Sequence, residues 1–191
     1  DVLGSRGLGD VYKRQVLILV ISTDLGAALI YFVVYLIMLY VATRQPLYAV
    51  AGVGAGCGAA VIGYHIFSHI KVRVAAWQDP FATYSNGGYQ IAQSLFAIGS
   101  GGLFGLGFGN SRQKYMYVSE PQNDFIFAIV CEELGIVGAV VVIALFGILI
   151  WRGIKIAMNA PDTFGSLLVT GIVSLVGIQT FLNIAVVTKM I

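Results

Sequence analysis

Residues 125–151 read FIFAIVCEELGIVGAVVVIALFGILIW, a run of 27 residues with no basic side chain and two acids, Glu132 and Glu133. An α-helix advances about 1.5 Å per residue, so roughly 20 apolar residues cross a bilayer core about 30 Å thick. Helices of soluble proteins average only about 10–14 residues. The run therefore predicts a transmembrane helix.

Three further apolar runs predict the rest of a membrane domain. They cover residues 25–43, 47–70 and 164–188, with 19, 24 and 25 residues. Residues 16–22 are apolar up to Ser22 but too few to span, so they predict the end of a partial span. The expected fold class is an all-α polytopic membrane protein, a transmembrane bundle of four complete spans and one partial span.

The composition excludes two broad classes of protein. Hydrophobic residues make up 58% of the chain and charged residues 10%, against about 25% charged residues in a soluble domain. This excludes an ordinary soluble enzyme. The formal net charge of +2 gives no basis for charge-driven binding to nucleic acid, so no nucleic-acid partner is expected. Cys57 and Cys131 each lie within an apolar run, which indicates neither a disulfide framework nor a thiolate metal site.

The first fifteen residues differ abruptly from those that follow. Residues 1–15 hold three of the eleven basic residues and show no apolar period, and they are similar to translated sequencing-adaptor sequence. We expect a non-native tail there and a partial membrane domain over residues 16–191. A signal peptide is the competing interpretation, although residues 16–22 lack a full apolar core and a small-residue cleavage site.

The connections between the spans are unequal, and function is expected in the longest of them. Short connections carry Arg44, Arg152 and Lys155, so the positive-inside rule places them in the cytoplasm and the loop 71–124 outside. Positive charge kept outside favours the binding of an anionic ligand. The cations of this loop are Lys71, Arg73, Arg112 and Lys114.

Two segments inside the loop have recognisable patterns. Residues 87–98 carry apolar side chains at 91, 95 and 98, which predicts a short amphipathic helix lying at the membrane interface or dipping into it. Residues 99–109 are rich in glycine, yet no strand precedes them and no Gly-Lys-Ser/Thr closes them, which excludes a nucleotide-binding loop. A flexible re-entrant turn and a segment that partly enters lipid or packs on the bundle are the alternatives for this stretch.

Three acids lie at or inside the run 125–151. Asp124 directly precedes it and can either cap a helix or act as a general base at the membrane surface. Glu132 and Glu133 lie within the span, where a carboxylate must be paired, protonated or turned to a polar cavity. On a straight helix Glu132 lies about 80° round from Asp124 and about 12 Å deeper, whereas Glu133 faces the opposite side. Glu132 is thus expected to share a cavity with Asp124, and an interhelical ion pair is the alternative for both glutamates.

A set of short motifs is spread over the chain. They are Asp24-Leu25-Gly26, Asp79-Pro80, Gly88-Tyr89-Gln90, Gln93-Ser94-Leu95, residues 97–103 with Gly105, Gly107, Gly109 and Ser111, Arg112-Gln113-Lys114, Glu120, residues 124–128, Glu132-Glu133-Leu134-Gly135, Asn183-Ile184 and Val186-Val187-Thr188. With these motifs the chain resembles the SEDS proteins, the FtsW, RodA and SpoVE group of bacterial cell-wall polymerases, over essentially residues 16–188. Residues 111–114, Ser-Arg-Gln-Lys, are more similar to the FtsW and SpoVE branch than to RodA.

The resemblance implies a membrane glycosyltransferase that polymerises lipid II, the undecaprenyl-pyrophosphate-linked disaccharide pentapeptide, in cell division, sporulation or cell-shape maintenance. The essential acid of the family falls on Asp124, which would deprotonate the attacking sugar hydroxyl or help a divalent cation, Mg²⁺ or Mn²⁺, to activate it. The four loop cations would hold the diphosphate, and Gln93 and Glu132 are further residues expected to bind substrate. The implied location is the bacterial cytoplasmic membrane with the loop 71–124 outside. The implied partners are a class B penicillin-binding protein transpeptidase and the division or elongation machinery.

Two other functions stay open from the sequence: a lipid II flippase or other transporter that uses the acids inside the bundle, and a non-catalytic scaffold for a transpeptidase. The chain also departs mildly from the family pattern. Thr23, Ala27, Ser119 and Asn123 stand where the family usually has proline, threonine, proline and threonine. Family members have roughly ten spans, so the chain is expected to be a piece that lacks the early helices and the C-terminal helix and is inactive alone.

Overall fold

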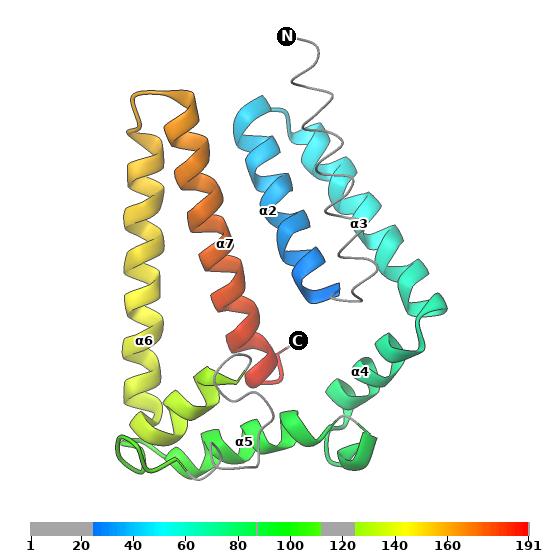
Figure 1. Ribbon diagram of the computed structural model, residues 1–191, viewed down its shortest axis with the longest axis vertical. Helices are drawn as coiled ribbons and strands as arrows, with labels where there is room; N and C mark the ends of the chain where they lie inside the picture. The colour runs from blue at the N-terminus through cyan, green and yellow to red at the C-terminus, as the bar shows by residue number, and fades with distance from the viewer. Residues whose placement is uncertain (1–24, 87, 112–124, 191) are drawn as a thin grey trace.

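The computed structural model describes residues 25–86, 88–111 and 125–190, and within these ranges all regular structure is helical (Figure 1). Four of the described helices are long and apolar enough to cross a membrane. They are α2 (Leu25–Thr43), α3 (Pro46–Ile66), α6 (Ile126–Met158) and α7 (Thr163–Val187). The expected fold class, an all-α polytopic membrane protein, is confirmed. The predicted tail at 1–15 and the partial span at 16–22 lie outside the described residues.

The long helices pack side by side with glycines at their contacts. α6 and α7 run antiparallel, α2 lies against α7, and α3 lies against α2 (Figure 1). A Cβ atom at Gly153 of α6 would overlap the side chain of Val173 of α7. One at Gly171 of α7 would lie 3.0 Å from the sulfur of Met38 of α2. Small residues at these positions let the membrane helices approach closely enough for van der Waals packing to hold them together.

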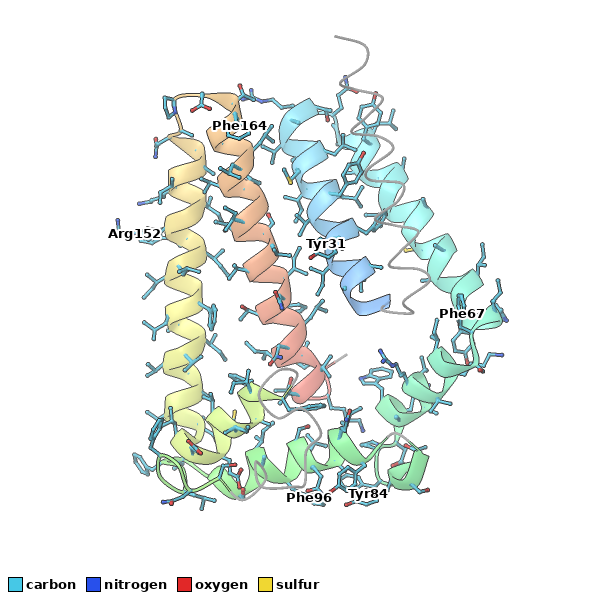
Figure 2. All side chains as sticks on the ribbon, viewed as in Figure 1. Tyr31, Phe67, Tyr84, Phe96, Arg152 and Phe164 are labelled. Atoms are coloured by element: carbon cyan, nitrogen blue, oxygen red, sulfur yellow. The ribbon has the colours of Figure 1, made fainter. Side chains whose placement is uncertain are left out.

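The second span is shorter than the predicted range 47–70. α3 ends at Ile66, Phe67 is extended with φ −98° and ψ 113°, and α4 (Ser68–Gln78) begins directly after it, at the corner labelled in Figure 2. Lys71 and Arg73 belong to α4, and their charges are costly inside the apolar layer. The corner was not predicted, because residues 67–70 (Phe-Ser-His-Ile) carry no formal charge and the predicted span therefore ran on to the first basic residue, Lys71.

α6 continues past the predicted end at Trp151, so Arg152 and Lys155 lie on the helix and not in the connection. The Lys155 ammonium lies 4.1 Å from the centroid of the Trp151 ring, and Arg152 points away from the bundle (Figure 2). Long basic side chains reach from a helix end into the membrane interface, which lets the helix continue. α2 coincides with the predicted range 25–43, and α7 begins and ends one residue before the predicted range.

The connections gather at two opposite ends of the bundle (Figure 1). At one end lie the α2–α3 turn at Arg44 and the α6–α7 turn. Asp162 caps α7 there, because its Oδ2 accepts a hydrogen bond of 2.7 Å from the N–H of Gly165. At the other end α5 (Tyr89–Gly101) lies across the bundle and packs on α6 and α7. The two short connections therefore share one end, and α5 occupies the opposite end.

The buried apolar core lies where α5, α6 and α7 meet. Its members are Ala97, Phe125, Phe127, Ala128, Cys131, Ala139 and Val187. Ser94 of α5 is fully buried beside this core and donates from its hydroxyl to the carbonyl oxygens of Ile91 at 2.8 Å and Val187 at 3.2 Å. α5 is therefore joined to the end of α7 as well as to α6.

Candidate active site

α6 is not one straight helix, because its backbone breaks at Gly135. Gly135 has φ 67° and ψ −171°, a combination that essentially only glycine adopts. Residues 126–134, which we call the inclined part of α6, lie at an angle to the rest of the helix (Figure 1). Residues 136–158 alone measure about 35 Å and suffice to cross the bilayer core. The single straight helix assumed from the sequence over residues 125–151 was wrong, because the backbone breaks at Gly135.

A glycine-rich segment fills the break, and we call residues 102–111 the strap. In a continuous helix the two N–H groups after the break would bond the two carbonyl groups before it. All four groups pair instead with the backbone of the strap, which satisfies these two donors and two acceptors. The bonds run from Leu106 N–H to Glu132 O (2.9 Å), Gly107 N–H to Glu133 O (3.1 Å), Ile136 N–H to Gly102 O (3.0 Å) and Val137 N–H to Leu103 O (3.2 Å).

Three glycines allow these backbones to come so close. A Cβ atom at Gly101 would overlap the backbone of Cys131, and one at Gly105 would overlap the carbonyl of Glu133. A Cβ atom at Gly135 would overlap the N–H of Gly105. Gly105 and Gly135 also have positive φ angles of 80° and 67°. Of the alternatives for the glycine-rich stretch, the structure supports a segment packed on the bundle.

The carboxyl groups of Glu132 and Glu133 are buried, with 1% and 8% of the residue surface exposed. Both meet Ser111, the last residue of the strap, which is itself 1% exposed. The Ser111 hydroxyl donates to Glu132 Oε2 at 2.5 Å, and its N–H donates to Glu133 Oε1 at 3.3 Å. Such bonds to carboxylates offset part of the loss of hydration on burial. Glu133 was expected to face away from the site on a straight helix, but Ser111 of the strap contacts both glutamate side chains.

Gln93, predicted to bind substrate, lies on α5 and is 6% exposed. Its Nε2 donates a hydrogen bond of 2.8 Å to the hydroxyl of Tyr84, which begins the short 3₁₀ helix η1 (Tyr84–Asn86) and lies near the start of α5 (Figure 2). The Tyr84 ring meets the Tyr89 ring edge to face, with 5.0 Å between centroids. Gln93 is therefore held in place within the α5 end of the bundle, and its contact with a substrate stays a prediction.

The residue after Asp124 is fixed in the core. Phe125 is 4% exposed and is the N-cap of α6, and its carbonyl accepts a hydrogen bond of 3.0 Å from the N–H of Ala128. The N-cap position of α6 thus falls on Phe125, the residue directly after Asp124. Asp124, the predicted catalytic residue, lies outside the described residues, as do Arg112 and Lys114.

Lys71 and Arg73 lie near the end of α5 that is opposite the strap. Both side chains are exposed on α4, and Lys71 Nζ lies 5.8 Å from the centroid of the Tyr64 ring. The turn that follows α4 packs on the start of α5, because a Cβ atom at Gly88 would overlap the backbone of Pro80. α5 has 13 residues, so its ends are about 20 Å apart. The structure does not bring these two cations to the buried glutamates.

The described ranges contain no group of three His, Cys, Asp or Glu side chains that could hold a metal ion. Glu132 and Glu133 supply two carboxyl groups, and each accepts a bond from Ser111. A cavity of about 770 Å³ opens at the other end of the bundle, where Arg44 and Asp162 line it. None of the predicted site residues lines that cavity, so the candidate site is at the α5 end.

Sequence reasoning placed Gln93 and Glu132 in the site but gave no role to Ser111 or Tyr84. The signal for Ser111 was weak: a serine after a glycine run, with a hydroxyl able to bond an acid. Neither helical periodicity nor spacing shows that a segment 21 residues before Glu132 returns to it. Only the strap's path across α6 brings Ser111 to both glutamates.

Comparison with known proteins gives one family. A family model named FTSW_RODA_SPOVE and described as "Cell cycle protein" matches residues 11–191. The match begins within the stretch 1–15 and extends to the last residue of the chain.

Three relatives show how far the similarity extends. Stage V sporulation protein E of Bacillus subtilis is 41% identical over 188 residues, which cover 96% of this chain and 50% of that protein. Peptidoglycan glycosyltransferase RodA of Mycobacterium tuberculosis is 39% identical, over 91% of this chain and 37% of the relative. Probable peptidoglycan glycosyltransferase FtsW of Geobacter sulfurreducens is 40% identical, over 92% of this chain and 47% of the relative. The chain thus spans half or less of the length of these curated relatives.

Proposed function

Because this chain belongs to the FtsW/RodA/SpoVE family of cell cycle proteins, we propose that the complete protein is a peptidoglycan glycosyltransferase that polymerises lipid II. The observation that carries the proposal is similarity over nearly the whole chain to proteins named as peptidoglycan glycosyltransferases. The α5 end of the bundle supports it as well. There the residue next to Asp124 is anchored in the core, and two buried carboxyl groups are held in fixed positions.

In the proposed reaction a sugar hydroxyl attacks the anomeric carbon of lipid II. A glycosidic bond forms, the bond from that carbon to the diphosphate breaks, and the hydroxyl proton passes to Asp124 as general base. Cationic side chains stabilise the negative charge that develops on the diphosphate. Those proposed for this role are Lys71, Arg73, Arg112 and Lys114, and Gln93 and Glu132 are proposed to hold the sugar part of the substrate.

A divalent cation, Mg²⁺ or Mn²⁺, is a further part of the proposal. We propose Asp124 as one of its ligands; the described residues contain no group of three His, Cys, Asp or Glu side chains that could hold the ion. When bound, such an ion would make the sugar hydroxyl more acidic. The steps given above are nevertheless carried by the protein's own side chains.

The proposal is tested with the complete protein in proteoliposomes and fluorescent lipid II. We expect strands many disaccharides long, resolved by gel electrophoresis and digested by a muramidase. Purified, folded protein that makes no strands, with or without Mg²⁺ or Mn²⁺ and with or without a class B penicillin-binding protein, would overturn the proposal.

The second candidate is a transporter of lipid II, favoured by the burial of Glu132 and Glu133 in a membrane helix. A transporter that uses Glu132 should stop moving labelled lipid between leaflets when Glu132→Gln is made, and an unchanged flipping rate would remove this candidate. The break at Gly135 counts against it, because both glutamates precede the break and so lie outside the straight part of α6, residues 136–158. A third candidate, a scaffold, predicts that substitutions alter only binding to a transpeptidase.

We also propose that the protein lies in the bacterial cytoplasmic membrane with its α5 end outside, beside a class B penicillin-binding protein and the division or elongation machinery. The arrangement of the connections supports this orientation, because basic residues on the cytoplasmic side are the rule for short loops. Arg44, Arg152 and Lys155 all lie toward the end opposite α5.

This orientation predicts which positions an impermeant thiol reagent can reach. In a variant with Cys57→Ser, we expect a cysteine replacing Phe104, which is 82% exposed on the strap, to be labelled in intact cells. A cysteine replacing Gln45, exposed in the α2–α3 turn, should be labelled only after the membrane is opened. Cys131 is buried and provides the background. The reverse pattern would show that the α5 end faces the cytoplasm.

A further inference from the structure

The strap and the inclined part of α6 form one interlocked unit. Two backbone hydrogen bonds join the strap to the inclined part, at Glu132 and Glu133, and two more join it to Ile136 and Val137 beyond the Gly135 break. Close backbone approach at Gly105 leaves no room for a side chain between the strap and the inclined part. Packed backbones of this kind have few alternative arrangements, because any shift costs several hydrogen bonds at once. The orientation of the inclined part therefore depends on where the strap is held.

Ser111, the last residue of the strap, attaches that end of the strap to α6. Its two donors reach two neighbouring acids, the hydroxyl to Glu132 and the N–H to Glu133. All three residues are buried, and hydrogen bonds to a carboxylate in a buried site are among the strong ones. Glu132 and Glu133 belong to the inclined part, so Ser111 joins the end of the strap to the inclined part by hydrogen bonds.

The inclined part begins next to the proposed general base, since Phe125 follows Asp124 in the sequence and caps α6. It also packs on α5, which carries Gln93, through the backbone contact of Gly101 with Cys131. A change in the angle of the inclined part would therefore move the start of α6 relative to α5. Catalysis is sensitive to such movements, because misplacement by about 1 Å can lower a rate about a hundredfold.

We propose that Ser111 is a positioning residue, whose hydroxyl acts through Glu132 to fix the inclined part of α6 against α5. The inference rests on the proposed function, because it assigns Ser111 a role in strand synthesis. It predicts that losing the hydroxyl impairs turnover more than substrate binding. The fold itself should persist, because the N–H of Ser111 and the four backbone bonds remain.

The test uses Ser111→Ala in the complete protein. We expect kcat for strand synthesis per mole of folded protein to fall at least about tenfold, the loss typical of one hydrogen bond to a charged group, with KM for lipid II nearly unchanged. Ser111→Thr keeps the hydroxyl and should recover most of the rate. Ser166→Ala is the matched control, because it removes a hydroxyl that donates to the carbonyl of Ala157 at 2.9 Å near the opposite end of the bundle. It should leave kcat unchanged.

A double-mutant cycle shows whether Ser111 acts through Glu132. Ser111→Ala combined with Glu132→Leu should be no slower than Glu132→Leu alone, because leucine, unlike glutamine, offers the Ser111 hydroxyl no acceptor. Losses that multiply would overturn the proposal. A wild-type kcat in Ser111→Ala would also overturn it. If the alanine variant does not fold, Ser111→Cys, with a weak S–H donor of similar size, takes its place, and a wild-type rate in that variant overturns the proposal equally.

Hydrogen exchange provides a readout that does not depend on activity. Ser111→Ala should speed amide exchange in residues 126–137 and leave residues 163–187 of α7 unchanged, and Ser166→Ala should leave 126–137 unchanged. If the wild-type protein makes no strands, the proposed function fails. The exchange rates of Ser111→Ala and the wild type still test whether Ser111 positions the inclined part of α6. Exchange in 126–137 that does not respond to Ser111→Ala would overturn the inference.

Discussion

Replacing Asp124 by alanine in the complete protein is expected to lower the rate of strand synthesis about 10²–10⁴-fold, which is what a positioned general base contributes. Asp124→Asn should be nearly as slow, because an amide has a similar size but cannot accept the proton of the sugar hydroxyl. The measurement is the initial rate of polymerisation of fluorescent lipid II per mole of folded protein. KM should change little, because the base is used in the transition state and not for holding the substrate.

Asp162→Ala is the matched control for this substitution. Asp162 is also an acid at the start of a membrane helix, and it caps α7 through the N–H of Gly165. Its loss should lower the free energy of unfolding by about 0.5–2 kcal/mol, the usual range for an N-cap, without changing the rate. If Asp124→Ala retains most of the wild-type rate, Asp124 is not the base. If both variants lose total activity only in proportion to their loss of folded protein, Asp124 has only a structural role.

The fold was largely predictable because the bilayer constrains it so strongly. Every spanning segment must satisfy its backbone internally, so a long apolar run can only be a helix, and α2 and α7 lie within one residue of the predicted ranges. The helix predicted at 87–98 is confirmed as α5, although the residues it buries are Ala92, Gln93, Ser94, Ala97 and Gly101, and the apolar positions 91, 95 and 98 are only half-buried. The corner at Phe67 was missed, since hydropathy reports solvent preference and not backbone direction.

The site was predictable only in part, because its geometry depends on contacts between distant segments. Hydropathy made Glu132 and Glu133 conspicuous, since acids are rare in an apolar run. It could not show that α6 breaks at Gly135, because an isolated glycine is compatible with a continuous helix. The break exists because the strap supplies the hydrogen bonds that α6 gives up. No local pattern in α6 contains that information.

The break predicts unusually large effects of adding one methyl group. Gly135→Ala and Gly105→Ala are each expected to lower the free energy of unfolding by about 2–6 kcal/mol. A positive φ costs a non-glycine residue about 1–3 kcal/mol, and overlap with packed backbone adds about 1–3 kcal/mol. Both costs apply to both residues. Gly105 and Gly135 have positive φ angles, and a Cβ atom at either position would overlap backbone atoms of the other segment. The measurement is equilibrium unfolding of the purified complete protein in mixed micelles.

Gly147→Ala is the matched control, because Gly147 lies on α6 with no atom within 4 Å of an added Cβ. Alanine favours a helix by up to about 1 kcal/mol over glycine, so this variant should be as stable as the wild type or slightly more stable. Gly135→Ala with wild-type stability would mean that α6 can run straight through residue 135, pairing Ile136 N–H with Glu132 O. The strap would then lose its partners in α6, and residues 102–107 would exchange their amide protons rapidly. The free energy of unfolding and the amide exchange of residues 102–107, both measured on Gly135→Ala, thus distinguish a break that the strap maintains from a break that α6 can close.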